Sequence, residues 1–177
     1  QNLLSQMIAK QAQRIDRIIQ DTLNMVRNRE THPAQIQLNQ FIPQMIQEDL
    51  ADIIKQIRCS IPHKISITFD EAQFRQVLIN LIRNAIRHNS PEHSHIELNI
   101  YSHESNVRID VRDFGTGVAS KDLSYLFQPF FSTEITGTGL GLYLSHSFCE
   151  ANQAKLDYVE QKQGACFRIE CQRVALN

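Results

Sequence analysis

The first thirty residues carry apolar positions spaced as in a coiled coil. Steps of four and three alternate along seven positions, five of which are apolar: Leu4, Ile8, Gln11, Ile15, Ile18, Thr22 and Met25. This regularity predicts a helix over residues 1–30 that packs in a coiled coil or a helical hairpin. Ile19, Leu23 and Val26 widen the stripe, so we expect more than one neighbouring helix. The alternative is a surface helix lying on its own domain. Since the pattern is under way at Gln1 without a capping residue, we expect a longer helical region.

The spacing of apolar residues predicts alternating helices and strands after the break at Pro33. In chain order they are a helix at 38–57, a strand at 64–69, a helix at 71–88 capped by Asp70, strands at 95–101 and 106–112, an irregular stretch to about 138 with a short helix near 121–127, a helix at 140–151, and strands at 155–160 and 165–173. This order predicts an α+β fold, a two-layer α/β sandwich in which a mixed sheet packs on helices.

Composition narrows the class of protein without identifying it. The 177 residues suffice for one domain and an appended element, and with 42% apolar and 21% charged residues the chain reads as soluble and globular. The 18 basic and 19 acidic residues nearly balance, and we expect no nucleic acid among the partners. No apolar stretch is long enough to span a bilayer. The four cysteines form no C-x-x-C pair, which argues against zinc or disulfides and fits a reducing cytoplasm: Cys59, Cys149, Cys166 and Cys171.

The predicted helix 71–88 carries the first of four short patterns with chemical potential. Asn80 and Asn84 are four residues apart and share a face, with Arg87 and His88 one turn further on. Two amides on one face can offer oxygens to a hard cation and NH2 groups to phosphate. Taken alone, the pattern would favour two solvated asparagines.

The second pattern, Asp113-Phe114-Gly115-Thr116-Gly117, directly follows a predicted strand. A carboxylate there can accept a hydrogen bond from the amino group of a base, and glycines let the backbone approach a ligand closely. The alternative is a plain turn. Asp-Phe-Gly also occurs in eukaryotic-type protein kinases, but their other motifs are missing, so we discard that match.

The third pattern, at 127–133, places three phenylalanines within five positions around a proline: Phe127, Phe130 and Phe131. It is either a small satellite core under a loop or the anchor of a mobile segment. The fourth pattern runs from Thr136 through Gly137, Thr138, Gly139, Leu140 and Gly141 to Leu142, where it opens a helix. Glycines before a helix N-terminus expose N–H groups that bind phosphate. No Gly-Lys-Ser/Thr follows, so it is not a Walker A loop.

These four patterns, in this order, resemble the N, G1, F and G2 boxes of the histidine kinase branch of the ATPase superfamily shared with Hsp90, DNA gyrase B and MutL. The resemblance covers about residues 36–173. Residues 1–32 resemble the second helix of the dimerisation and phosphotransfer hairpin, and 33–177 the catalytic ATP-binding domain. The segments 149–158 and 164–169 resemble in particular the sensor kinases that control type IV pilus genes.

The resemblance implies ATP and Mg²⁺ as cofactors. Asn84 would be the magnesium ligand, Asn80 and Arg87 would contact phosphates, and Asp113 would accept the adenine amino group. The full set of residues that it assigns to ATP binding is Asn80, Asn84, Arg87, His88, Asp113, Gly115, Gly117, Phe131, Thr133, Gly137, Thr138, Gly139, Leu140 and Gly141. The lid between Thr133 and Gly137 is short for this family.

The activity that the resemblance implies is transfer of the γ-phosphoryl group to a histidine, for relay to an aspartate of a response regulator. The histidine motif that receives the phosphoryl group is absent, so we expect that this chain alone does not autophosphorylate. None of the seven histidines has that context: His32, His63, His88, His93, His95, His103 and His146. The expected partners are ATP, a receiver domain, the chain's own hairpin and a second copy, on the cytoplasmic side of an inner-membrane protein. The alternative reading is an ATP-gated dimerisation module or a serine kinase of the same superfamily.

Overall fold

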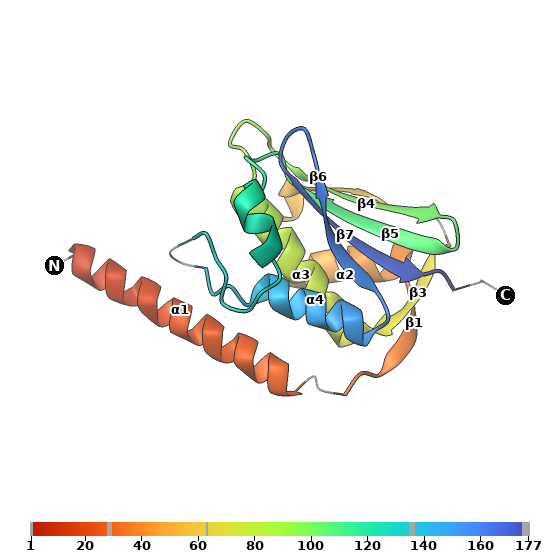
Figure 1. Ribbon diagram of the computed structural model, residues 1–177, viewed down its shortest axis with the longest axis horizontal. Helices are drawn as coiled ribbons and strands as arrows, with labels where there is room; N and C mark the ends of the chain where they lie inside the picture. The colour runs from red at the N-terminus through yellow and green to blue at the C-terminus, as the bar shows by residue number, and fades with distance from the viewer. Residues whose placement is uncertain (1, 28–29, 63, 135–136, 175–177) are drawn as a thin grey trace.

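The computed structural model describes residues 2–27, 30–62, 64–134 and 137–174 (Figure 1). His63 and Thr136, and the side chains of Leu23, Met25 and Val26, lie outside this description.

The first helix, α1 (Asn2–Arg27), forms as its heptad spacing predicts. Figure 1 shows it projecting beside the rest of the molecule, and it contacts α4. Its apolar stripe is nevertheless open to solvent, since Leu4, Ile8 and Ile15 are each more than half exposed. Among the described residues, this part of the stripe therefore lacks the helix partner that its spacing predicts.

The prediction for residues 38–57 is wrong in its length. Helix α2 (Leu38–Asp49) ends eight residues early, and a turn, a 3₁₀ segment η1 (Ile54–Gln56) and strand β2 (Ile57–Ser60) follow. Leu50 is fully buried and Ile53 packs on the core, so apolar residues recur past the end of the helix. The apolar spacing beyond Asp49 therefore reflects burial of these side chains and not a continuing helix.

Two sheets are present among the described residues. Strand β1 (Pro33–Gln37), which the sequence did not predict, pairs antiparallel with β3 (Ser66–Asp70). The larger sheet has the order β2-β4-β5-β7-β6, with strands β4 (Ile96–His103), β5 (Asn106–Arg112), β6 (Lys155–Glu160) and β7 (Ala165–Gln172). The pair β2–β4 is parallel and the other pairs are antiparallel, so the sheet is mixed as predicted.

Helices cover one face of the larger sheet, and the second layer is formed by α2, α3 (Glu71–His88) and α4 (Gly141–Ala151) (Figure 1). Alternate residues of β4 and β5 are buried against them, among them Leu98 and Ile109. The opposite face carries paired charges, such as Arg168 with Asp110 at 2.7 Å. The predicted two-layer α/β sandwich is confirmed.

Helix α3 begins as the sequence predicts. The Asp70 carboxylate accepts a hydrogen bond from the Gln73 N–H at 3.0 Å and another from the His32 N–H at 2.8 Å. Phe74, Leu78 and Leu81 of α3 are fully buried. With this side fixed in the core, the opposite side of α3 faces the loop that joins the 3₁₀ segment η2 (Ser120–Tyr125) to α4 (Figure 1).

Candidate functional site

A cavity of about 850 Å³ lies between α3, the loop after β5 and the segment that leads into α4. Twelve of the predicted site residues line it: Asn80, Asn84, Arg87, His88, Asp113, Gly117, Phe131, Thr133, Gly137, Thr138, Gly139 and Gly141. Gly115 and Leu140 do not line it but adjoin residues that do. A volume of this size accommodates a nucleotide-sized ligand.

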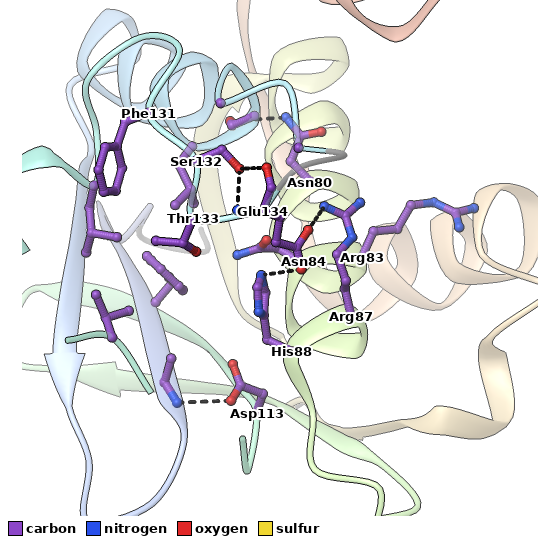
Figure 2. A pocket seen from close by; sticks show the side chains of 18 of the residues that line it. Asn80, Arg83, Asn84, Arg87, His88, Asp113, Phe131, Ser132, Thr133 and Glu134 are labelled. Carbon is purple, nitrogen blue, oxygen red and sulfur yellow. Dashed lines mark hydrogen bonds and ion pairs between the residues drawn. The ribbon is translucent and has the colours of Figure 1, made fainter. Parts of the chain in front are cut away.

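The Asp113 carboxylate lies at one end of the cavity (Figure 2). It is 3% exposed, and its Oδ1 accepts hydrogen bonds from the N–H groups of Gly115 at 2.9 Å and Ala165 at 3.1 Å. Within the described residues, Oδ2 has no hydrogen-bond partner. One oxygen is thus fixed by the protein while the other can accept a hydrogen bond from a ligand in the cavity.

Gly115 is required by a close backbone approach. A Cβ atom there would lie 1.9 Å from the carbonyl oxygen of His88, where no side chain fits. The loop after β5 therefore lies directly against the last turn of α3. Asn89, which the sequence analysis missed, holds the same junction, because its Oδ1 accepts from the Phe114 N–H at 2.9 Å. The only sequence signal for Asn89 was its place just after the predicted helix.

Asn80 and Asn84 differ in what they touch. The Asn80 amide accepts from Gln76 at 3.0 Å and is within 3.4 Å of both the Gly141 carbonyl oxygen and the Ser145 hydroxyl. It therefore links α3 to the first turn of α4. The Asn84 side chain lines the cavity and makes no hydrogen bond or ion pair with any described residue. Its carbonyl oxygen is free to bind a cation, and its NH2 group to bind an anion.

The glycine-rich segment leads into an uncapped helix. Gly139 has a φ of +70°, and a Cβ there would lie 2.4 Å from the carbonyl carbon of Phe130, so a glycine is needed for both reasons. No side chain caps the N-terminus of α4, and its first turn holds no acidic residue. Its first N–H groups can therefore bind an anion at the positive end of the helix dipole.

The predicted phenylalanine cluster is divided in the structure. Phe127 packs against His146 of α4 and Phe167 of β7, with ring centroids 4.8 and 6.4 Å away. Phe131 stacks on Tyr125 at 5.8 Å, whereas Phe130 is 72% exposed. Phe127 thus anchors the base of the segment to the domain, and the other two rings do not join it in one core.

Glu134 is another residue of the cavity that the sequence did not predict. Its carboxylate lies within 3.4 Å of Arg87 Nη1 and 3.6 Å of His88 Nε2 (Figure 2). Nothing in the local sequence signalled these contacts, because the partners lie 47 and 46 residues earlier in the chain.

The described residues contain no cluster of three or more His, Cys, Asp or Glu side chains that could hold a metal by themselves. None of the described helices is long and apolar enough to cross a membrane.

The chain is similar to one known family and to named sensor kinases. The profile of the "Histidine kinase-, DNA gyrase B-, and HSP90-like ATPase" family matches residues 69–174. Sensor protein kinase PilS of Pseudomonas aeruginosa is 34% identical over 174 residues, which cover 94% of this chain and 33% of PilS. Sensor histidine kinase ZraS of Escherichia coli is 30% identical over 171 residues, covering 94% of this chain and 37% of ZraS. The chain thus spans about a third of the length of these relatives.

Solved structures agree with the family match. The catalytic domain of histidine kinase ThkA superposes with a TM-score of 0.69 at 25% identity, covering 80% of this chain and 95% of that one. The structure of ThkA in complex with response regulator protein TrrA gives a TM-score of 0.73 at 21% identity, covering 95% of this chain and 50% of ThkA. The second likeness shows the fold over 95% of this chain.

Proposed function

This chain belongs to the histidine kinase-, DNA gyrase B- and HSP90-like ATPase family, and from that premise we propose that its cavity binds Mg-ATP as the catalytic domain of a two-component sensor histidine kinase. The observation that carries the proposal is the Asp113 carboxylate, buried at the cavity wall with one oxygen fixed and the other free. The exocyclic amino group of adenine is a hydrogen-bond donor that fits the free oxygen. Guanine carries a carbonyl oxygen at that position, which a carboxylate repels.

The phosphates belong at the opposite end of the cavity. The N–H groups at the start of α4 and the guanidinium of Arg87 supply the positive charge that they need. Gly137, Gly139 and Gly141 would form the hinge of the lid on the phosphate side, with Thr138 near the phosphate tail. Leu140 would adjoin this hinge, and Thr133 and Phe131 would lie at the other end of the lid. Gly115 and Gly117 would shape the purine pocket.

The residues present fit a magnesium ion that is held mainly by the nucleotide. Mg²⁺ takes oxygen ligands and keeps several waters, so one protein oxygen together with phosphate oxygens suffices. The Asn84 amide offers such an oxygen with no competing partner among the described residues. The ion would neutralise phosphate charge and so ease transfer of the terminal phosphoryl group.

The proposed reaction delivers the γ-phosphoryl group to a histidine outside this chain and then to an aspartate of a response regulator. No histidine here has the expected acceptor context. Residues 1–32 would form the second helix of a dimerisation hairpin, and residues 33–177 would form the catalytic domain. The exposed stripe of α1 supports this division, and the ThkA–TrrA complex supports a receiver partner. The 34% sequence identity to PilS supports a role in the control of type IV pilus genes, by an inner-membrane protein whose catalytic part is cytoplasmic.

Isothermal titration calorimetry tests ATP binding directly. The chain should bind ATP in a 1:1 ratio, and Mg²⁺ should tighten the complex in the wild type but not in Asn84→Ala. ATP binding that ignores Mg²⁺, or an Asn84→Ala variant that responds to Mg²⁺ like the wild type, would remove Asn84 from the metal site. No binding of ATP would end the proposal.

The absence of the phosphoacceptor is tested with γ-labelled ATP. We expect no acid-labile label on this chain alone, and labelling of an added phosphotransfer hairpin that contains the acceptor motif. A stable acid-labile label on the isolated chain would contradict the assignment.

A further inference from the structure

The phosphate end of the cavity already contains a negative charge from the protein itself. Glu134, in the segment between Phe131 and α4, directs its carboxylate to the last turn of α3 (Figure 2). Its Oε2 lies 3.4 Å from Arg87 Nη1, and its Oε1 lies 3.6 Å from His88 Nε2. The Glu134 side chain is 29% exposed and the Arg87 side chain 42%, so the pair is partly shielded from water.

The backbone of the segment holds Glu134 in this position. The Ser132 hydroxyl accepts a hydrogen bond from the Glu134 N–H at 3.1 Å and donates one to the Glu134 carbonyl oxygen at 3.1 Å. The same carbonyl oxygen accepts from the Gly137 N–H at 3.3 Å. These bonds fix the backbone from which the Glu134 side chain extends, and the contacts with Arg87 and His88 then hold its carboxylate at α3.

Arg87 carries the permanent positive charge that Glu134 contacts. The contact with His88 is an ion pair only when the imidazole is protonated. Among the ion pairs of the described residues, Glu134 is the one acidic partner of Arg87 and of His88. A guanidinium binds a carboxylate and a phosphate with the same N–H groups, so both ligands compete for it.

We propose that Glu134 is a built-in competitor for the phosphate-binding cations, and that ATP must displace its carboxylate from Arg87 and His88 to bind. This inference rests on the proposed function, since it assigns the regulation of the same nucleotide site. Part of the attraction between Arg87 and the phosphates is offset by the broken pair and by repulsion between Glu134 and the incoming anion. Glu134 thus weakens binding in proportion to phosphate charge and leaves recognition of the base unaffected.

The test is a calorimetric comparison of the wild-type chain with Glu134→Gln, using adenosine, ADP and ATP in turn, each with and without Mg²⁺. Glutamine retains the size of the side chain and removes its charge. Because the pair is partly exposed, we expect ATP to bind about two- to tenfold more tightly to the variant. Adenosine, which has no phosphate, should bind both proteins equally within about twofold, and ADP should gain less than ATP.

Glu150→Gln is the matched control. Glu150 lies 3.6 Å from His146, the same separation as between Glu134 and His88, and it is on α4 outside the cavity. It removes the same charge, so a gain caused by net charge alone would appear in both variants. In an Arg87→Gln background, the increase in ATP affinity caused by Glu134→Gln should be less than half of that in the wild-type background. The cation for which the carboxylate and the phosphates compete is then gone.

The possible outcomes are distinguishable. Tighter ATP binding with unchanged adenosine binding supports the competition. Equal ATP affinity of wild type and variant overturns the inference and leaves the proposed function intact. Weaker ATP binding by the variant only when Mg²⁺ is present also overturns it, because Glu134 would then help to hold the metal. A wild-type chain that binds neither adenosine nor ATP removes the proposed function and the competition together.

Discussion

Replacement of Asp113 by asparagine changes a single oxygen that faces the cavity. In the wild type, Oδ1 accepts two backbone N–H groups and Oδ2 is open to the ligand. Asparagine can retain the first role only by turning its oxygen to Gly115 and Ala165. Its NH2 group then faces the cavity, where it opposes the adenine amino group with a second donor.

The magnitude follows from the bond that is lost. A hydrogen bond to a charged acceptor contributes about 1.5–3 kcal/mol, so ATP affinity should fall about 10- to 100-fold. GTP should lose less or gain, because the new NH2 group can donate to the guanine carbonyl oxygen. The ratio of GTP to ATP affinity therefore rises in Asp113→Asn. The N–H groups of Gly115 and Ala165 would then donate to a neutral amide oxygen and not to a carboxylate. We expect the free energy of unfolding to fall by about 1–2 kcal/mol.

Calorimetric titration of both nucleotides measures this change, at a temperature well below the unfolding transition of the variant. Asp157→Asn, at an exposed aspartate of β6 outside the cavity, removes the same charge and should leave both affinities within about twofold. Equal ATP affinity in wild type and Asp113→Asn would refute the adenine assignment. An equal loss of affinity for ATP and GTP would mean that Asp113 supports the shape of the cavity but does not distinguish adenine from guanine.

The structure makes three further predictions. Gly139→Ala should lower the free energy of unfolding by more than about 2 kcal/mol in urea titrations, because φ is +70° and Phe130 blocks the new Cβ. Gly141→Ala, whose Cβ would lie 3.9 Å from Asn80 Cγ, should change the free energy of unfolding by less than about 0.5 kcal/mol; equal losses would contradict the backbone argument. In thiol titration at pH 8, Cys59, whose side chain is exposed, should react in the folded chain. Partial shielding of its sulfur from water raises its pKa to about 11 and slows the reaction, and all four cysteines should react in denaturant. Rapid reaction of two or more thiols in the folded chain would contradict the burial of Cys149, Cys166 and Cys171. The hydrogen bond from Arg108 lowers the pKa of Glu170 below 4.5, so this pair should stabilise the fold above pH 4.5 and lose its effect as the pH falls through the folded-state pKa. Glu170→Gln should therefore destabilise at pH 7 by about 0.2–1 kcal/mol and not at pH 2.5 in matched unfolding curves, and an equal deficit at both values would contradict the linkage.

Local signals account for the elements that the sequence predicted well. Asp70 caps α3 through a bond to Gln73, and both cap and helix are readable from adjacent residues. The alternation of β4 and β5 is equally local, because one face of each strand is buried under helices.

The elements that the sequence missed depend on distant partners. Strand β2 exists because Ile57–Ser60 pairs with β4, about forty residues later in the chain. Ile57 continues the apolar spacing of Leu50, Ile53 and Ile54, so no local feature of the sequence indicated that α2 ends at Asp49. Strand β1 starts at Pro33, where a missing N–H is tolerated at the end of a two-stranded sheet.

The residues of the candidate site also fall into those that local motifs predict and those that depend on distant partners. Asn84, Asp113 and Gly139 stand in short motifs whose residue types already suggest a nucleotide, and the fold brings them to one cavity. Glu134 stands in no such motif. Its role depends on its contacts with Arg87 and His88 across the cavity. Ion pairs between segments far apart in sequence require the tertiary structure before they can be recognised.

A crystal structure of the chain with Mg²⁺ and a non-hydrolysable ATP analogue tests the central claim most directly. The adenine amino group should lie within hydrogen-bond distance of Asp113 Oδ2, the phosphates at the first turn of α4 and Arg87, and the metal on the Asn84 amide oxygen. A nucleotide bound with its base at α4, or outside this cavity, would contradict the account.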